Sequence, residues 1–333
     1  MNAILGRTEL SVCKDGFGAL PIQRADSEQA RYILRRALDI GINFFDTAAA
    51  YTDSEEKIGN ALSEERGRFI LATKVKPDIS VFWESLENSL KMLKTDHIDI
   101  FQLHNPSFCP KPDDGSGLYE AMLKAKEQGK IRFIGISNHR MPVARSAVES
   151  GLYDTLQFPF SYLSNYTEIA LVKLCADLGV GFIAMKALSG GLISDIGAAR
   201  SWINQFENVV PIWGIQRKEE LESLTNVMHQ SAGITPERQS RIDHDRAELT
   251  GAFCRGCSYC MPCPQGIQIN PIARLPLFLR RSPVNNWLSD DWKAEMENTK
   301  LCNDCKSCIA KCPYGLDIPD LLKKSYDDYM TFL

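Results

Sequence analysis

The sequence Asn-Phe-Phe-Asp at residues 43–46 is a short apolar run that ends in a carboxylate, and similar runs recur along the chain. Phe-Ile-Leu-Ala-Thr-Lys at 69–74 ends in a lysine, and Ile-Asp-Ile-Phe-Gln-Leu at 98–103 is followed by His104. Short apolar runs bounded by polar or turn residues are typical of buried β-strands. The same pattern predicts five more strands, at residues 15–19, 133–137, 155–158, 181–185 and 209–212.

Amphipathic segments lie between these strands and predict helices at residues 27–40, 80–93, 117–128, 167–178 and 218–230. Glycine occurs where several helices should end, at Gly41, Gly129, Gly151 and Gly179. Alternating strands and helices predict an α/β protein with a parallel sheet. Eight such units favour a closed (β/α)8 TIM barrel over residues 1–240. The alternative is an open, doubly wound sheet, but the turn Gly16-Phe17-Gly18-Ala19 lacks the third glycine of its nucleotide-binding loop.

The composition of the 333 residues is that of a globular protein, with 44% hydrophobic and 24% charged residues. The net charge is 38 − 42 = −4, so there is no basic excess to indicate nucleic-acid binding. Apolar runs stay shorter than the roughly 18 residues that a membrane helix needs, so we expect no membrane span. The first residues do not resemble a signal peptide, and we expect a cytoplasmic protein.

Eight of the eleven cysteines form two closely spaced runs near the C-terminus. Disulfides are disfavoured in a cytoplasmic chain of this size, and zinc is an alternative ligand for paired Cys-x2-Cys units. Three cysteines at x2 steps, with a fourth followed by proline, are instead typical of [4Fe–4S] ferredoxins. The second run has the ferredoxin spacing, and the first is one residue shorter before its fourth cysteine. The runs comprise Cys254, Cys257, Cys260 and Cys263, and Cys302, Cys305, Cys308 and Cys312.

The resemblance to two-cluster ferredoxins implies that each fourth cysteine ligates the other cluster. One cluster would be held by Cys254, Cys257, Cys260 and Cys312, and the other by Cys302, Cys305, Cys308 and Cys263. We therefore expect an α-helical, ferredoxin-like domain with two [4Fe–4S] clusters over residues 241–333.

Four segments of the first part of the chain resemble the aldo-keto reductases. They are Phe-Asp-Thr-Ala-Ala-Ala-Tyr at 45–51, Ile-Leu-Ala-Thr-Lys at 70–74, Asp-Ile-Phe-Gln-Leu-His-Asn-Pro at 99–106 and Ile-Gly-Ile-Ser-Asn at 134–138. The whole chain resembles the branch of that family in which the barrel carries two C-terminal iron–sulfur motifs.

This resemblance implies a catalytic tetrad. Tyr51 would donate a proton to the substrate carbonyl, and Lys74 would lower the pKa of Tyr51, as a nearby positive charge does. Asp46 would hold Lys74 as its salt-bridge partner, and His104 would orient the carbonyl oxygen. The hydride would come from a nicotinamide, which implies reversible NAD(P)H-dependent reduction of a carbonyl to an alcohol.

The resemblance also implies contacts to the nicotinamide nucleotide. Ser137, Asn138 and Gln157 match positions that hydrogen-bond the carboxamide, and Met185 stands where most of the family has a stacking tyrosine. Ser189 and Gly190 offer backbone donors to the pyrophosphate. Beyond the last strand, Arg217 and Lys218 are candidates for the 2′-phosphate of NADP, which leaves NADP and NAD both open.

The clusters leave three interpretations of function open. They are structural, or they relay electrons between a ferredoxin-like redox partner and the barrel, or they sense the redox state while the barrel only binds. A cluster moves one electron and a hydride carries two, so a nicotinamide cannot feed a cluster without a mediator such as a flavin. The expected substrate is a small-molecule carbonyl or alcohol, with an iron–sulfur electron-transfer protein as the alternative.

Overall fold

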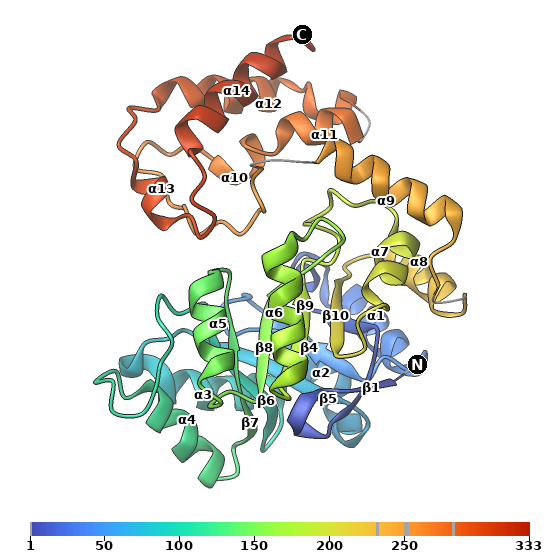
Figure 1. The fold of residues 1–333 in the computed structure, drawn as a ribbon, viewed down its shortest axis with the longest axis vertical. Coiled ribbons are helices and arrows are strands. Elements are labelled where there is room, and N and C mark those ends of the chain that lie inside the picture. The colour runs from blue at the N-terminus through green and yellow to red at the C-terminus, as the bar shows by residue number, and fades with distance from the viewer. Residues whose placement is uncertain (1, 231–232, 250–252, 282–283) are drawn as a thin grey trace. The chain divides into compact units, whose positions relative to one another are not determined.

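The computed structural model describes residues 2–230, 233–249, 253–281 and 284–333 (Figure 1). The chain forms two compact units. The first comprises Met1–Leu188 and Asp195–Asp243, and the second comprises Ser189–Ser194 and His244–Leu333. Compactness alone does not show that either part folds independently, so the domain limits 1–240 and 241–333 stay a prediction.

Eight parallel strands close into a barrel within the described residues, which confirms the predicted fold (Figure 1). Their order around the barrel is β10-β3-β4-β5-β6-β7-β8-β9, so each strand pairs with its neighbour in sequence and the last pairs with the first. The strands are β3 (Gly16–Gly18), β4 (Phe44–Asp46), β5 (Ile70–Val75), β6 (Ile98–His104), β7 (Ile131–Ser137), β8 (Thr155–Pro159), β9 (Gly181–Met185) and β10 (Val209–Gly214).

Helices connect the strands, as the amphipathic segments predict. Asp26 caps the first of them by accepting a hydrogen bond from the Gln29 backbone N–H at 2.8 Å. Gly41, Gly129, Gly151 and Gly179 all have positive φ beyond helix ends, as predicted. The helices of this unit are α1 (Ser27–Asp39), α2 (Ser54–Leu62), α3 (Ile79–Leu93), α4 (Leu118–Glu127), α5 (Met141–Glu149), α6 (Tyr166–Asp177), α7 (Ile196–Ile203) and α8 (Lys218–Met228), with 3-10 turns η1 (Gly6–Thr8), η2 (Pro21–Arg24) and η3 (Ser63–Arg68).

An antiparallel hairpin, β1 (Asn2–Ile4) and β2 (Ser11–Cys13), precedes the barrel and was not predicted from the sequence. Leu5, Leu10 and Val12 are buried in one cluster with strand residues such as Phe44 and Ile100. The hairpin therefore supplies apolar side chains to the barrel core.

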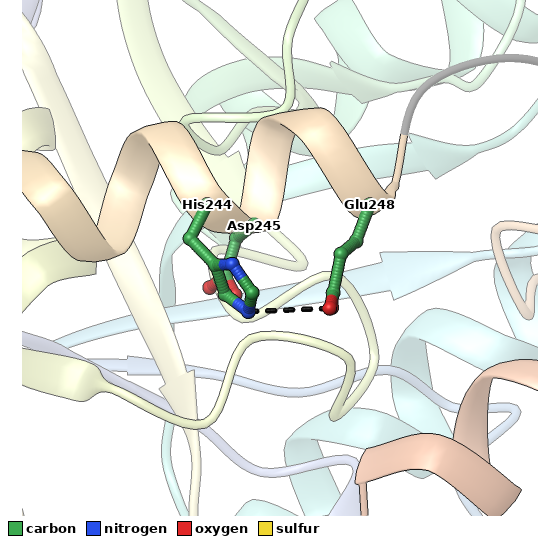
Figure 2. A group of neighbouring side chains, drawn as sticks. All are labelled: His244, Asp245 and Glu248. Carbon is green, nitrogen blue, oxygen red and sulfur yellow. Dashed lines mark ion pairs between the residues drawn. The ribbon is translucent and has the colours of Figure 1, made fainter.

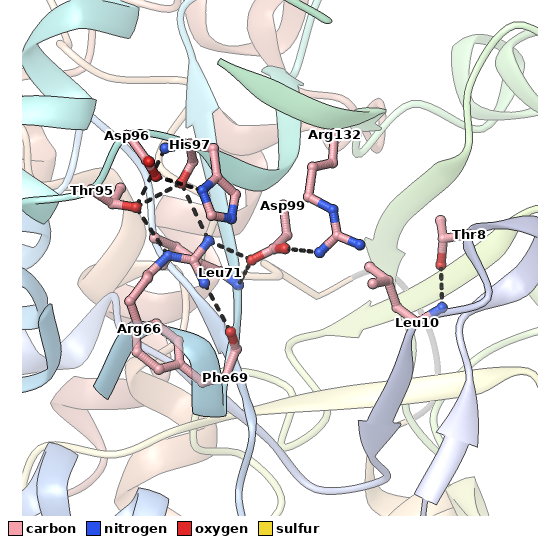
Figure 3. Close-up of polar contacts among 10 residues, drawn as sticks. All are labelled: Thr8, Leu10, Arg66, Phe69, Leu71, Thr95, Asp96, His97, Asp99 and Arg132. Atoms are coloured by element: carbon pink, nitrogen blue, oxygen red, sulfur yellow. Dashed lines mark hydrogen bonds and ion pairs between the residues drawn. The ribbon is translucent and has the colours of Figure 1, made fainter. Parts of the chain in front are cut away.

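The buried carboxylate of Asp99 joins three neighbouring strands or their connections near the start of β6 (Figure 3). It accepts hydrogen bonds from Arg66 Nη2 at 2.6 Å, from the Leu71 backbone N–H at 2.9 Å, and from Arg132 Nη1. Since two guanidinium groups and an amide surround it, the buried charge is compensated by the chain itself.

The second unit is helical, as predicted for the C-terminal region, and has its own apolar core. Buried residues such as Ile272, Leu279 and Leu322 pack together there, with several of the clustered cysteines at the edge. Its elements are α10 (Ile269–Ile272), α11 (Leu275–Arg281), η4 (Val284–Trp287), α12 (Asp290–Glu297), η5 (Asn298–Leu301), α13 (Ser307–Lys311) and α14 (Ile318–Met330). Helix α9 (Pro236–Glu248) contributes residues to both units. Among the described helices, none is both long and apolar enough to cross a membrane.

Candidate active site and iron–sulfur sites

Three of the predicted catalytic residues lie at the C-terminal ends of adjacent barrel strands. Asp46 ends β4, Lys74 is next to the end of β5, and His104 ends β6. Tyr51 follows in the loop between β4 and α2. Because these strands are parallel neighbours, their ends share one rim of the barrel, which is where barrels of this type carry their active sites.

Asp46 and Lys74 form a buried ion pair, as predicted. Lys74 Nζ donates to Asp46 Oδ1 at 2.7 Å and to the Thr47 carbonyl oxygen at 2.7 Å. Burial raises the pKa of Asp46 and lowers the pKa of Lys74, while the charge of each partner opposes the shift of the other. The contact therefore fixes the position of the ammonium group below the rim.

Tyr51 lies beside this ion pair. Lys74 Nζ is 5.2 Å from the centre of the Tyr51 ring. The imidazole of His104 meets the same ring edge-on, with centroids 5.9 Å apart and an interplanar angle of 84°. The structure thus brings all four predicted tetrad residues together.

The pKa of Tyr51 shifts in the direction opposite to the one predicted. It is raised by burial and further by the negative charge of Asp46. The prediction weighed only the positive charge of Lys74, whereas the phenol is buried and that charge is balanced by Asp46 at 2.7 Å, so the phenol experiences an ion pair. The resting phenol therefore keeps its proton at neutral pH and can act as an acid.

His104 is neutral in this site. Burial lowers its pKa to about 3, and the positive charge of Lys74 contributes to the shift. A neutral imidazole has one N–H donor and one acceptor nitrogen. His104 can therefore donate one hydrogen bond without adding a charge.

Two buried glutamines lie beneath the ion pair, and only one of them was singled out from the sequence. Gln102 Nε2 donates to Asp46 Oδ2 at 3.2 Å and to Gln157 Oε1 at 2.9 Å, and Gln157 Nε2 donates to Asp46 Oδ1 at 3.3 Å. The signal for Gln102 was present, because an amide interrupts the otherwise apolar run 100–103 two residues before His104. Both amides orient Asp46 in this arrangement.

The three residues predicted to hold a nicotinamide carboxamide differ in whether their side-chain hydrogen-bonding groups already have partners in the chain. Ser137 is buried, and its hydroxyl makes no hydrogen bond within the described part of the chain. Asn138 Nδ2 donates to the Pro106 carbonyl oxygen at 2.9 Å, and its Oδ1 accepts from the Arg140 backbone N–H at 2.8 Å. The Ser137 hydroxyl is thus unengaged, whereas the side chains of Asn138 and Gln157 already bond to other groups of the chain.

The other predicted nucleotide contacts lie on or beyond the seventh and eighth barrel strands. Met185 ends β9 and is partly buried. Arg217 forms an ion pair with Glu220 at 2.7 Å, and Lys218 lies 4.3 Å from the centre of the Tyr32 ring. Both cations are therefore already engaged, which leaves little to distinguish NADP from NAD.

Ser189 and Gly190, predicted to face the pyrophosphate, belong to the second unit. Both have positive φ, and their carbonyl oxygens accept hydrogen bonds from Arg274 Nη2 at 3.2 and 2.6 Å. Their carbonyl groups are thus directed to a cation from the cysteine-rich unit.

Cysteines from both runs line one small cavity in the second unit. The rest of its lining is mostly apolar, with Ile269, Ala273 and Leu316 among the residues. The pKa of Cys260 is raised to about 12 by burial and by the neighbouring thiols. A chamber with four convergent thiols fits a [4Fe–4S] cluster, since iron takes thiolate ligands there. The four are Cys254, Cys257, Cys260 and Cys312, the set implied by cross-ligation.

The second predicted set is more open. Cys302 and Cys305 are exposed, and Cys308 is partly buried. Burial raises the pKa of Cys308, and the thiols of Cys302 and Cys305 add to the shift, so these three groups are neighbours. Cys263 and Cys308 both pack at the edge of the same apolar core. These positions are compatible with a second cluster site.

His244, Asp245 and Glu248 form a further group of ligand-type side chains on α9 (Figure 2). His244 Nε2 lies 3.2 Å from Glu248 Oε1, and both side chains are about half exposed. Pairs four residues apart are common on helix surfaces, so we interpret the contact of His244 with Glu248 as a surface ion pair, whereas Asp245 is buried.

Two family descriptions match the chain. Residues 16–238 match the Aldo/keto reductase family, and residues 253–317 match the 4Fe-4S dicluster domain. The first match covers the barrel strands and the second covers both cysteine runs.

Curated relatives match the barrel part. L-Galactose dehydrogenase of Arabidopsis thaliana is 32% identical over 213 residues, which are 58% of this chain and 67% of the relative. The uncharacterized oxidoreductase YqkF of Bacillus subtilis is 29% identical over 206 residues, which are 57% of this chain and 66% of the relative. The chain thus spans about two thirds of the length of these relatives.

Solved structures share the barrel fold. An aldo-keto reductase of Bacillus halodurans in its holo form has a TM-score of 0.64 and 24% identity, over 73% of this chain and 95% of that one. An aldo/keto reductase of Klebsiella pneumoniae in complex with NADP and acetate has a TM-score of 0.61 and 23% identity, over 73% and 94%.

Proposed function

The chain belongs to the aldo/keto reductase family and carries a 4Fe-4S dicluster domain, and from this premise we propose that it interconverts a carbonyl and an alcohol at Tyr51. The observation that carries the proposal is the convergence of Tyr51, Lys74 and His104 at one rim of the barrel. The substrate class is a small-molecule carbonyl or alcohol, as in the rest of the family.

In the reducing direction, Tyr51 donates its hydroxyl proton to the carbonyl oxygen. The group is protonated at neutral pH, as a proton donor must be, and its raised pKa means that the phenolate formed on donation needs stabilisation by the site. The neutral imidazole of His104 donates a hydrogen bond to the same oxygen and orients it. A bound nicotinamide supplies the hydride that the carbonyl carbon takes up.

Lys74 acts after the proton has left the phenol. The nascent phenolate then has an ammonium group 5.2 Å from its ring centre, and that charge lowers the cost of the anion. Asp46 acts through Lys74, because it holds the ammonium in place at 2.7 Å. Asp46 is thus a positioning residue in this proposal.

The same proposal assigns the nicotinamide to NADP or NAD. The holo and NADP-containing structures among the fold neighbours support a nucleotide cofactor. Ser137, Asn138 and Gln157 would hold the carboxamide, and Met185 would contact the ring. Ser189 and Gly190 would lie near the pyrophosphate.

We propose that the dicluster domain holds two [4Fe–4S] clusters with exchanged fourth ligands. The cavity lined by Cys254, Cys257, Cys260 and Cys312 supports the first set. Cys302, Cys305, Cys308 and Cys263 make up the second. Such clusters carry single electrons or hold a fold together, and free thiolates for their assembly suit a reducing, cytoplasmic setting.

A second candidate function is a reductase in which the clusters, and not a nicotinamide, supply electrons to the barrel site. The engaged amides of Asn138 and Gln157 favour it, since they bind other groups of the chain. Reduction of one carbonyl then takes two electrons and two protons, delivered one electron at a time from a ferredoxin-like partner. Tyr51 supplies one of the protons in this case too.

Substitution of Tyr51 by phenylalanine tests the proposed acid. We expect Tyr51→Phe to lower kcat by about 10²–10⁴-fold on a panel of carbonyls, with cluster content unchanged. The matched control is Tyr166→Phe, because Tyr166 on α6 is 83% exposed and should leave the rate unchanged. A Tyr51→Phe protein with near-normal kcat would overturn the proposal.

An anaerobic assay distinguishes the two electron sources. Carbonyl-dependent oxidation of NADPH or NADH with unchanged cluster absorbance supports the nicotinamide route. Turnover with dithionite alone, accompanied by bleaching and recovery of cluster absorbance, supports the cluster-fed route.

A further inference from the structure

Arg274 is a buried cation that the reaction above does not use. It lies between α10 and α11 and is only 7% exposed. Its Nη2 donates to the carbonyl oxygens of Ser189 and Gly190, and its guanidinium lies 4.8 Å from the centre of the Phe278 ring. Nε has no hydrogen-bond partner in the described part of the chain.

No carboxylate pairs with Arg274 among the described residues. Two carbonyl dipoles and an aromatic face are weak compensation for a buried guanidinium, which is costly to bury without an anion. The other buried arginine among the described residues is paired, since Arg200 Nε lies 2.9 Å from Asp15 Oδ1. Arg274 therefore lacks the counter-ion that its burial calls for.

The first cysteine run lies directly beside Arg274. A side-chain carbon at Gly256 would be 2.7 Å from Arg274 Nη1, so only a glycine admits the guanidinium at this distance. Gly256 is flanked by Arg255 and Cys257, and its backbone N–H donates to Cys254 Sγ at 3.4 Å. Ala273, the residue before Arg274, lines the four-cysteine cavity.

We propose that Arg274 is the counter-ion of the first [4Fe–4S] cluster and raises its reduction potential. This rests on the proposed cluster site at Cys254, Cys257, Cys260 and Cys312. Four thiolates outweigh the positive charge of the cluster core, so the ligated cluster is an anion that becomes more negative on reduction. A fixed cation stabilises the reduced form more than the oxidised form.

The same guanidinium links the cluster to the segment Ser189–Ser194. Its two hydrogen bonds to Ser189 and Gly190 hold that segment against the first cysteine run. Arg274 is therefore a positioning residue as well as a counter-ion.

A redox titration monitored by electron paramagnetic resonance tests the proposal on the full-length holoprotein, purified anaerobically and reduced with dithionite. Arg274→Gln removes the charge. We expect it to lower one of the two midpoint potentials by about 59 mV or more, a tenfold change for a one-electron couple, and to leave the other unchanged.

Two further variants serve as controls. Arg274→Lys keeps the charge, so the midpoint potential of that cluster should stay close to the wild-type value. The matched control is Arg280→Gln on the same unit. Arg280 is already paired with Asp328 at 2.6 Å, so this change should leave both potentials unchanged.

Iron and acid-labile sulfide are measured for every variant. Arg274→Gln can fail to retain iron. In that case, an Arg274→Lys protein that keeps both its iron and its midpoint potential supports the role of Arg274 as counter-ion. Loss of iron in both variants overturns that role. Equal shifts in Arg274→Lys and Arg274→Gln, or none in Arg274→Gln, overturn it as well. Wild-type protein without iron or signal would instead refute the cluster site itself.

Discussion

The barrel contains buried ion pairs, whereas the buried Arg274 of the second unit has no carboxylate partner among the described residues and donates to backbone carbonyl oxygens instead. In the barrel, Lys74 contacts Asp46, and Asp99 contacts Arg66 and Arg132. In the second unit, thiols line a cavity, and the guanidinium of Arg274 lies beside Gly256 of the first cysteine run. The difference indicates that these barrel charges are compensated within the chain, and we infer that the charge of Arg274 is compensated by what the cysteine-rich unit binds.

Removal of iron should give the largest contrast between the two units. We expect anaerobic chelation to abolish most of the amide-exchange protection in residues 253–281 and 284–333 and to leave β4–β7 protected. The reason is that α10 and α13 have only four and five residues and are too short to be stable without the clusters. Mass spectrometry of exchanged peptides measures this, with mock-treated holoprotein as the control. Equal loss of amide-exchange protection in both units, or no loss in the second unit, would contradict the expected difference between them.

Lys74→Met breaks the charge pairing of the barrel. It leaves Asp46 buried without its partner, and we expect the free energy of unfolding of the barrel to fall by about 3–5 kcal/mol. The double variant Asp46→Asn, Lys74→Met removes both charges and should recover part of this loss. Urea unfolding followed by circular dichroism measures both.

The control for this prediction is Lys130→Met, which breaks a partly exposed pair with Glu87. It should cost no more than about 1 kcal/mol, because exposed pairs contribute little. A Lys74→Met protein no less stable than this control would show that the buried pair does not stabilise the barrel.

Most of the barrel could be predicted from the sequence because its signals are local. Apolar runs of strand length, the Asp26 cap and the glycines after helices depend on neighbouring residues. The hairpin β1–β2 escaped prediction because its strands have only three residues each, and its packing depends on distant strands.

In the candidate site, too, the features that follow from local sequence could be predicted and those that depend on distant contacts could not. The positions of Asp46, Lys74 and His104 followed from the alternation of strands and polar ends, and their proposed roles stay predictions. The pKa of Tyr51 could not be predicted, because its direction depends on the burial of the phenol and on Asp46 cancelling Lys74. The contact of Arg274 with Ser189 and Gly190 joins residues more than eighty positions apart and leaves no local pattern.

Mild acid should weaken the barrel through His104. Its pKa is about 3 when folded, against an ordinary value of 6.5, so the unfolded chain binds a proton first as the pH falls. Stability is therefore lost on acidification between pH 6.5 and pH 3, at about 1.4 kcal/mol per pH unit or about 2 kcal/mol by pH 5. Urea unfolding of the barrel at pH 7 and pH 5 measures the loss.

His104→Gln should remove part of this pH dependence. The pKa of buried His139 is also lowered, by burial and by nearby cations, so it contributes a similar slope that remains in the variant. A His104→Gln protein with the same slope as the wild type would show that the imidazole of His104 is not kept neutral by the fold.

The smallest predicted effects come from two helix caps, one in each unit. Asp26 caps α1 in the barrel, and Asp317 caps α14 in the second unit by accepting from the Asp320 backbone N–H at 3.2 Å. Replacing either by alanine removes one such hydrogen bond and should cost about 1 kcal/mol. Asp26→Ala should cost the same with and without iron, because distant, independent sites are additive.

The stability cost of Asp317→Ala should depend on iron, unlike that of Asp26→Ala. Its cost should be seen only in the iron-loaded protein, because without clusters the helix it caps has little stability left to lose. It should also speed the release of iron to a chelator by about fivefold, the kinetic equivalent of about 1 kcal/mol. Equal costs for Asp317→Ala in loaded and iron-free protein would mean that the second unit folds without its clusters. The unpaired charge of Arg274 would then have to be tolerated by the chain alone.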